Sequence, residues 1–196
     1  MKTNSKSKTL LALVLAITLA ATGCSAQWIN TALQDLPVLT QMALNIATLV
    51  TTLAAGQQAS AADTAVIQNI SAQASRDLNL LQTLYNEYKA SPSPTTLQKI
   101  QSAIADLNQN LPTMLQSAHI SNATVSARIT AAVNLILTTV NSFAALMPQA
   151  TLVTSRKASP TPLLHPKDLR KQWNQQVCAA TGNPALDAAF AASALR

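Results

Sequence analysis

Few residues of this chain could carry out chemistry, and they are far apart in the sequence. The candidates are two cysteines, two histidines, Glu87 as the only glutamate, and six aspartates. Neither His119 nor His165 lies at ligand spacing from another His or Cys, and no C-x-x-C-H haem motif occurs. Di-iron bundles need several glutamates and a Glu-x-x-His pair on facing helices. We therefore expect no metal and no cofactor.

The three glycines give no support to nucleotide or acyl-transfer chemistry. Gly23 lies near the N-terminus, and Gly56 and Gly182 lie where helical segments are expected to end. No glycine-rich loop could cradle a phosphate, and no G-x-S-x-G turn is present. The sequence predicts that the protein is not an enzyme and indicates no catalytic residue.

Four single residues each allow a functional and a structural interpretation. Cys178 is interpreted as a small packing residue, with an intermolecular disulfide as the alternative. Asp77 lies beside an apolar stripe, either as a solvated flank or as a buried polar residue that favours one packing. Tyr85 and Tyr88 end a helical segment and are expected to pack with their hydroxyls in water, rather than to form a ligand platform.

The N-terminus has the organisation of a secretory signal. Lys2, Lys6 and Lys8 form a basic start, residues 10–21 are apolar apart from Thr18, and small residues follow. The apolar run is too short to remain as a bilayer-spanning helix. Export is therefore expected.

The sequence Ala21-Thr22-Gly23-Cys24 resembles the lipobox of bacterial lipoproteins, although that class usually has Leu at the position of Ala21. The resemblance implies acylation of Cys24 and cleavage just before it. Membrane lipid would then be a partner through the acylated cysteine. The alternative is ordinary cleavage after Ala26, because Cys24-Ser25-Ala26 is also small-x-small. It would leave a soluble exported helical bundle that binds a ligand or a partner.

Charge is sparse and uneven. Charged residues make up 10% of the chain, against about 25% in ordinary domains. Three of the thirteen basic residues lie in the signal, and residues 25–150 carry no basic stripe, so no nucleic-acid partner is expected. A surface of small polar residues resists association weakly, which favours a second copy or an envelope protein as partner.

Four long segments with helical periodicity follow the signal. Each has one apolar stripe with steps of three and four residues, which no helix can bury alone. The central stripe positions Ile46, Leu107 and Ile136 should be buried. The stripe of the first segment is Ile29, Ala32, Leu36, Leu39, Ala43, Ile46, Val50 and Leu53.

Prolines and polar residues predict where these segments begin, bend and end. Pro37 predicts a kink or a late start in the first segment, and Pro112 a bend near the end of the third. The second should begin near Ser60. Ser93 before Pro94 should cap the third. The fourth should be capped by Ser121 or Asn122 and closed by Pro148.

Short connections make consecutive helices antiparallel neighbours. The fold class predicted is therefore all-α, an up-down-up-down antiparallel four-helix bundle with a proline-rich linker and two short C-terminal helices. The expected division is a signal peptide at 1–23, the bundle at 24–148, the linker at 149–166 and the short helices at 167–196.

Basic and apolar residues alternate in the first C-terminal helix, and this pattern is typical of a helix at a membrane surface. Only three residues separate Cys24 from Trp28, which would place that indole near the bilayer. The residues expected at the membrane interface are Trp28, Lys167, Arg170, Lys171 and Trp173. The alternative is that Leu169, Trp173 and Val177 cap the open end of the bundle core.

Two charge-free stretches, 36–62 and 129–147, approach the length of a membrane span. Both contain Asn or Gln, and their apolar residues lie on one stripe rather than all round. A holin-like or pore-forming protein is thus a minor alternative.

The main functional prediction is an exported, membrane-anchored helical-bundle lipoprotein with a structural or binding role on the periplasmic side of the cell envelope. Ser25 after the lipidated cysteine is, by the resemblance, compatible with the outer membrane.

Overall fold

The computed structural model describes residues 5–57, 59–117, 120–147 and 164–196, and within these ranges it describes side chains from Trp28 onward. All regular structure in these ranges is helical, as predicted, and they contain no strand. The helices are α1 (Ser5–Ala55), α2 (Ala61–Ala90), α3 (Pro94–Ser117), α4 (Ala123–Leu146), α5 (Pro166–Gln176) and α6 (Pro184–Ala192).

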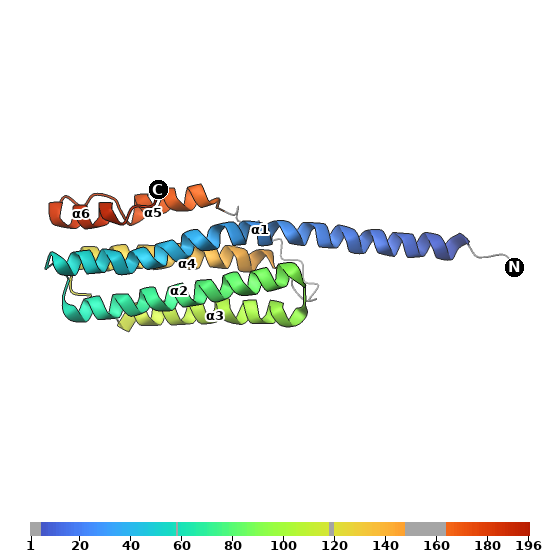
Figure 1. Ribbon diagram of the computed structural model, residues 1–196, viewed down its shortest axis with the longest axis horizontal. Helices are drawn as coiled ribbons and strands as arrows, with labels where there is room; N and C mark the ends of the chain where they lie inside the picture. The colour runs from blue at the N-terminus through green and yellow to red at the C-terminus, as the bar shows by residue number, and fades with distance from the viewer. Residues whose placement is uncertain (1–4, 58, 118–119, 148–163) are drawn as a thin grey trace.

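The four long helices lie side by side, each antiparallel to the next along the chain (Figure 1). α1 contacts α2 and α4, and α3 contacts α2 and α4, so that the four surround one apolar core. The N-terminal half of α1 extends beyond the bundle as a continuation of the same helix (Figure 1). The bundle therefore begins part-way along α1.

The central stripe residues are buried as predicted. Ile46, Leu107 and Ile136 are each 0% exposed, and they belong to one continuous apolar cluster. Burial of such side chains stabilises a fold by about 1.5–3 kcal/mol each. The core that the four stripes predicted is therefore the core of the structure.

Polar side chains begin the helices where the sequence indicated. The Ser60 hydroxyl accepts from the Asp63 amide (3.0 Å), and the Ser93 hydroxyl accepts from the Thr96 amide (3.1 Å). For α4 the cap is Asn122, whose side-chain oxygen accepts from two amides. Ser121, the alternative cap, instead donates its hydroxyl to the Asp63 carboxylate (2.6 Å), which ties the start of α2 to the start of α4.

Pro37 and Pro112 lie inside α1 and α3, and both helices continue past them. The late start predicted at Pro37 is wrong. Proline removes one backbone hydrogen bond, but the flanking residues Leu36, Val38 and Leu39 are buried against neighbouring helices. Their tertiary packing outweighs the lost bond, and exposed Pro37 faces solvent.

The two C-terminal helices add a layer to the bundle. Leu169, Trp173 and Val177 are each 0% exposed, so the apolar side of this segment packs on the core. However, α5 lies along α1 and α4, and α6 lies along α1 (Figure 1). The segment therefore packs on the bundle core, as the alternative interpretation predicted. The predicted position at the open end of the bundle is wrong, because the segment covers a flank.

The linker predicted at 149–166 falls mostly on residues 148–163, which lie outside the described residues. α5 begins at Pro166 within that predicted range and ends at Gln176, and Arg128 of α4 secures its end. The guanidinium donates to the Gln176 carbonyl (2.6 Å) and the Ala179 carbonyl (3.1 Å). These bonds hold the C-terminal layer against α4.

The buried seam should determine the stability of the bundle. Leu107→Ala should lower the free energy of unfolding by about 2–5 kcal/mol, because it leaves a cavity among fully buried neighbours. Leu44→Ala is a matched control, since Leu44 is 53% exposed and should change stability by less than about 0.5 kcal/mol. Urea denaturation of the full chain in a neutral detergent measures both, and equal effects would contradict the core assignment.

Candidate functional site

Cys24, the predicted lipidation residue, lies on α1, four residues before the first described side chain, Trp28. Nothing is described of the Cys24 side chain itself. Its position on the helix nevertheless fixes its relation to the bundle, because no loop separates it from the core residues that follow.

Trp28 is packed into the core. Its side chain is 6% exposed, and its ring meets Tyr85 edge to face at a centroid distance of 5.6 Å. Tyr85 in turn meets Phe143 at 6.4 Å. The Tyr85 hydroxyl is buried without a hydrogen-bond partner in the described part of the chain, and burial raises the pKa of Tyr85 far above its ordinary value. The prediction of a wet hydroxyl is therefore wrong for Tyr85.

Trp173 is also in the core, at 0% exposed, and its indole N–H donates to the Ser193 carbonyl (2.9 Å). In this packing neither tryptophan presents its ring to a membrane. The predicted membrane contact then depends on Lys167, Arg170 and Lys171 alone.

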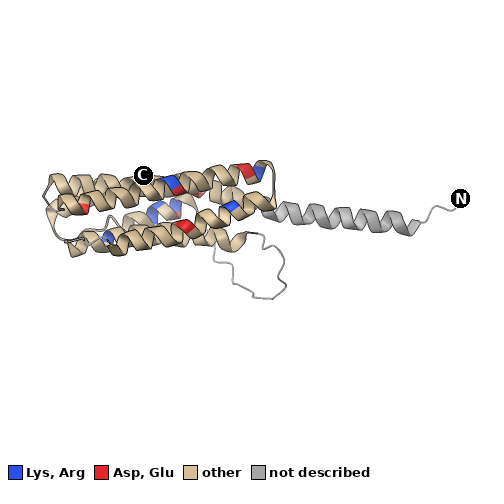
Figure 2. Ribbon diagram, turned by 90° about the horizontal axis from the view of Figure 1, so that it is seen from below, with Lys and Arg blue, Asp and Glu red and all other residues tan. Residues whose placement is uncertain are grey.

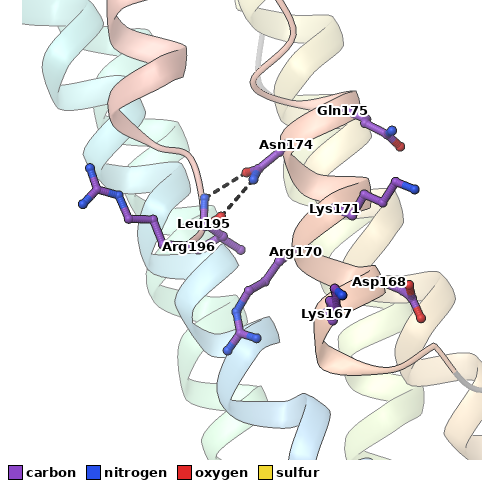
Figure 3. Close-up of a pocket in the computed structure, with 8 residues that line it drawn as sticks. All are labelled: Lys167, Asp168, Arg170, Lys171, Asn174, Gln175, Leu195 and Arg196. Atoms are coloured by element: carbon purple, nitrogen blue, oxygen red, sulfur yellow. Dashed lines mark hydrogen bonds between the residues drawn. The ribbon is translucent and has the colours of Figure 1, made fainter.

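These three basic residues line an open groove around the first turns of α5, together with the last residues of the chain (Figure 3). The groove has a volume of about 670 Å³. We call it the α5 groove, and its lining residues are Lys167, Asp168, Arg170, Lys171, Asn174, Gln175, Leu195 and Arg196.

The α5 groove concentrates positive charge on a weakly charged molecule. Charged residues are sparse along the four long helices (Figure 2). Of the eight Lys and Arg side chains that the structure describes, four line the groove, and Asp168 is the only acidic residue there. None of the four makes a salt bridge with a described residue. The salt bridge among the described residues joins Lys99 to Glu87 (4.0 Å), away from the groove.

Hydrogen bonds hold the two sides of the groove together. The Asn174 amide donates to the Leu195 carbonyl (2.8 Å), and its oxygen accepts from the Leu195 amide (2.9 Å). Arg170 is half-buried, and its Nε is buried without a hydrogen-bond partner among the described residues. Arg170 reaches toward α1, and Lys171 extends from the other side of α5 (Figure 3).

Asp35 is the most strongly perturbed carboxyl group of the described residues. It is 0% exposed on α1, and neither carboxylate oxygen has a hydrogen-bond partner in the described ranges. Burial raises the pKa of Asp35 to about 7, because the ionised form loses its hydration without gaining a partner. Asp77, for which a flank position and a buried position were both considered, is a half-buried flank residue that accepts from the Gln73 amide (2.9 Å).

Cys178 is half-buried and packs against the core, as its interpretation as a packing residue predicted. Burial raises the pKa of the Cys178 thiol, although hydrogen bonds from Ser193 and Trp173 and the charge of Arg128 act in the opposite direction. A protonated, half-buried thiol is a weak nucleophile.

No group of three or more His, Cys, Asp or Glu side chains that could hold a metal occurs in the part of the chain that the structure describes. His165 precedes α5, and His119 lies outside the described residues. Two segments, Trp28–Ala55 and Ala123–Leu146, are long and apolar enough to cross a bilayer by length and composition. In the structure their apolar stripes face a shared protein core.

Comparison with known proteins finds no relative of this chain. No family model, no curated protein and no solved structure matches it.

Three residues described here were not among those predicted from the sequence: Asn174 and Arg196 in the groove, and Asp35 in the core. Arg196 joins the other basic residues only because the chain folds back after α6, so sequence spacing gave no signal. Asp35 did carry a signal. It lies at helical spacing between Trp28, seven residues before it, and Met42, seven residues after it, both of which are buried.

Asp35 should make stability fall as pH rises. An unfolded aspartate ionises near pH 3.9, whereas folded Asp35 keeps its proton to about pH 7. Between these pH values Asp35 binds fewer protons in the unfolded state than in the folded state. Its ionisation therefore lowers the free energy of unfolding by up to about 1.4 kcal/mol per pH unit. Asp35→Asn should remove that loss, which urea denaturation between pH 4.5 and 8 would measure.

The matched control is Asp106→Asn, which removes a carboxylate from an exposed position on α3. It should leave the pH dependence of the wild type in place. An unchanged slope in Asp35→Asn would contradict the assignment of Asp35 as a carboxyl group that is protonated in the folded state.

Proposed function

We propose that the protein is an exported lipoprotein whose helical bundle is held at a membrane surface of the cell envelope by acylated Cys24. Its role there is structural or binding, and no catalytic role is proposed. By the resemblance of its signal it belongs on the periplasmic side, and Ser25 is compatible with the outer membrane.

The observation that carries the proposal is the continuity of α1. This helix runs from Ser5 to Ala55, and Trp28, four residues after Cys24, is already packed against Tyr85 in the core. Cleavage before Cys24 would therefore leave the acylated residue on the first turn of a bundle helix. The acyl chains would hold the folded bundle directly at the bilayer, without a flexible tether.

The packing of the apolar helices also supports anchoring rather than spanning. The stripes of Trp28–Ala55 and Ala123–Leu146 are buried against protein, and the first segment includes buried Asp35. A span facing lipid should be apolar all round, and a buried acid is costly there. The pore-forming alternative would require these helices to leave the core.

A soluble exported bundle is the second candidate, and the extent of the core is compatible with it. The described core begins at Trp28, so cleavage after Ala26 would leave every described core residue in the mature protein. The two candidates differ in the cleavage site and in the acylation of Cys24, and both differences can be measured directly.

Metabolic labelling with a fatty-acid analogue should label the mature protein in cells. Cys24→Ala should lose the label completely, because it removes the acylated thiol. Cys178→Ala is the matched control, since Cys178 is the only other cysteine, and it should keep the label. An unlabelled mature protein that begins at Gln27 would contradict the lipoprotein proposal and favour the soluble one.

A further inference from the structure

The α5 groove has more positive charge than the fold requires. Four cations, Lys167, Arg170, Lys171 and Arg196, line it beside a single carboxylate, Asp168, and none is paired with that carboxylate in a salt bridge. Like charges that share one groove repel one another, and they add nothing to the apolar packing of α5, which Leu169, Trp173 and Val177 provide. An anion in the groove would remove this repulsion.

The groove is also built on a rigid frame. Its two sides are joined by the paired hydrogen bonds between Asn174 and the Leu195 backbone. Trp173 and Asn45 both donate to the Ser193 carbonyl, each at 2.9 Å, which attaches the C-terminal segment after α6 to α5 and to α1. A rigid site loses little conformational entropy on binding.

We propose that the α5 groove binds a phosphate-bearing anion. A guanidinium offers paired N–H donors that match two phosphate oxygens, while an ammonium supplies a compact charge. The groove offers two of each kind, from Arg170 and Arg196 and from Lys167 and Lys171. Arg170 is held with its Nε buried, so its position is set by the packing of α5 on the bundle.

The position of the groove separates two sources of phosphate. Ser193 lies at the level of Asn45, which is 21 residues after Cys24, or about 32 Å along a helix. α5 runs in the same direction as α1 (Figure 1), so Lys167, six residues before Trp173, lies about 9 Å nearer the anchor. The groove therefore lies roughly 20–30 Å from Cys24.

That separation exceeds the screening length of about 8 Å at physiological ionic strength. If the bundle stands upright on its anchor, a phosphate that is not part of the anchoring bilayer fills the groove. A lipid headgroup can fill it when the bundle lies on its α1–α5 side. Only the distance of the groove from the bilayer depends on the proposed anchoring at Cys24. The proposed binding of a phosphate in the groove does not depend on it.

The test uses the full chain in micelles of a zwitterionic detergent at low salt. Inorganic pyrophosphate is titrated in one arm, and phosphatidylglycerol is added to the micelles in the other, with binding followed by calorimetry. The groove variant is Lys167→Gln/Lys171→Gln/Arg196→Gln. The control variant, Arg76→Gln/Lys89→Gln/Lys99→Gln, removes the same charge from exposed positions on α2 and α3.

The groove variant should bind about 100-fold more weakly, at about fivefold for each cation removed, and the control variant should change by less than about threefold. Arg170→Lys keeps the charge but removes the paired donors, and it should weaken binding about tenfold. Circular dichroism melting should show that all variants remain folded.

Each outcome decides the proposal. Saturable binding of pyrophosphate that is lost in the groove variant supports a free phosphoryl ligand. Binding only to phosphatidylglycerol micelles, lost in the same variant, supports a lipid headgroup. Absence of binding in both arms, or equal loss in the groove and control variants, would overturn the proposal. Labelling of Cys24 is measured separately, so failure of the anchoring proposal would leave this result interpretable.

Discussion

The structure depends on the need to cover α1 on several sides at once. Residues Ile29, Leu36, Ala43 and Val50 lie on one stripe of α1, while Trp28, Met42 and Leu49 lie on a second, and all are buried. One neighbouring helix cannot cover both stripes. α2 and α4 pack beside α1 in the bundle, and α5 and α6 complete the cover over its flank. The C-terminal layer is therefore part of the core and not an appendage.

This coverage explains why polar groups are found in the core. A side chain placed on the second stripe is buried whatever its chemistry, and Asp35 lies there without a partner in the described ranges. Other polar side chains make hydrogen bonds between helices. The buried Ser71 hydroxyl donates to the Ala43 carbonyl (2.6 Å), and at the surface the Asn108 and Asn141 amides pair between α3 and α4. Asp35 costs stability when ionised, whereas these pairs fix the register of neighbouring helices.

The same packing decides what the surface can do. Because Trp173 is needed in the core, α5 can present only its basic side to solvent, and the chain end returns along it through the Asn174–Leu195 bonds. A helix that resembles a membrane-surface helix in sequence thus becomes the wall of a charged groove. The proposed anchoring at Cys24 and the proposed anion site lie on the same α1 scaffold, separated by several helical turns.

The sequence by itself determined the helical class, the four long helices, most of their caps and the central core residues. Each of these follows from local hydrogen bonding or from a 3.6-residue apolar repeat, which neighbouring residues specify. It did not reveal the second stripe of α1, the burial of Asp35, or the meeting of Arg196 with Lys167 and Arg170. Only the tertiary structure decided these, because they depend on which helix covers which face. An apolar stripe predicts that one face of a helix is buried, but it does not indicate which segment packs against that face.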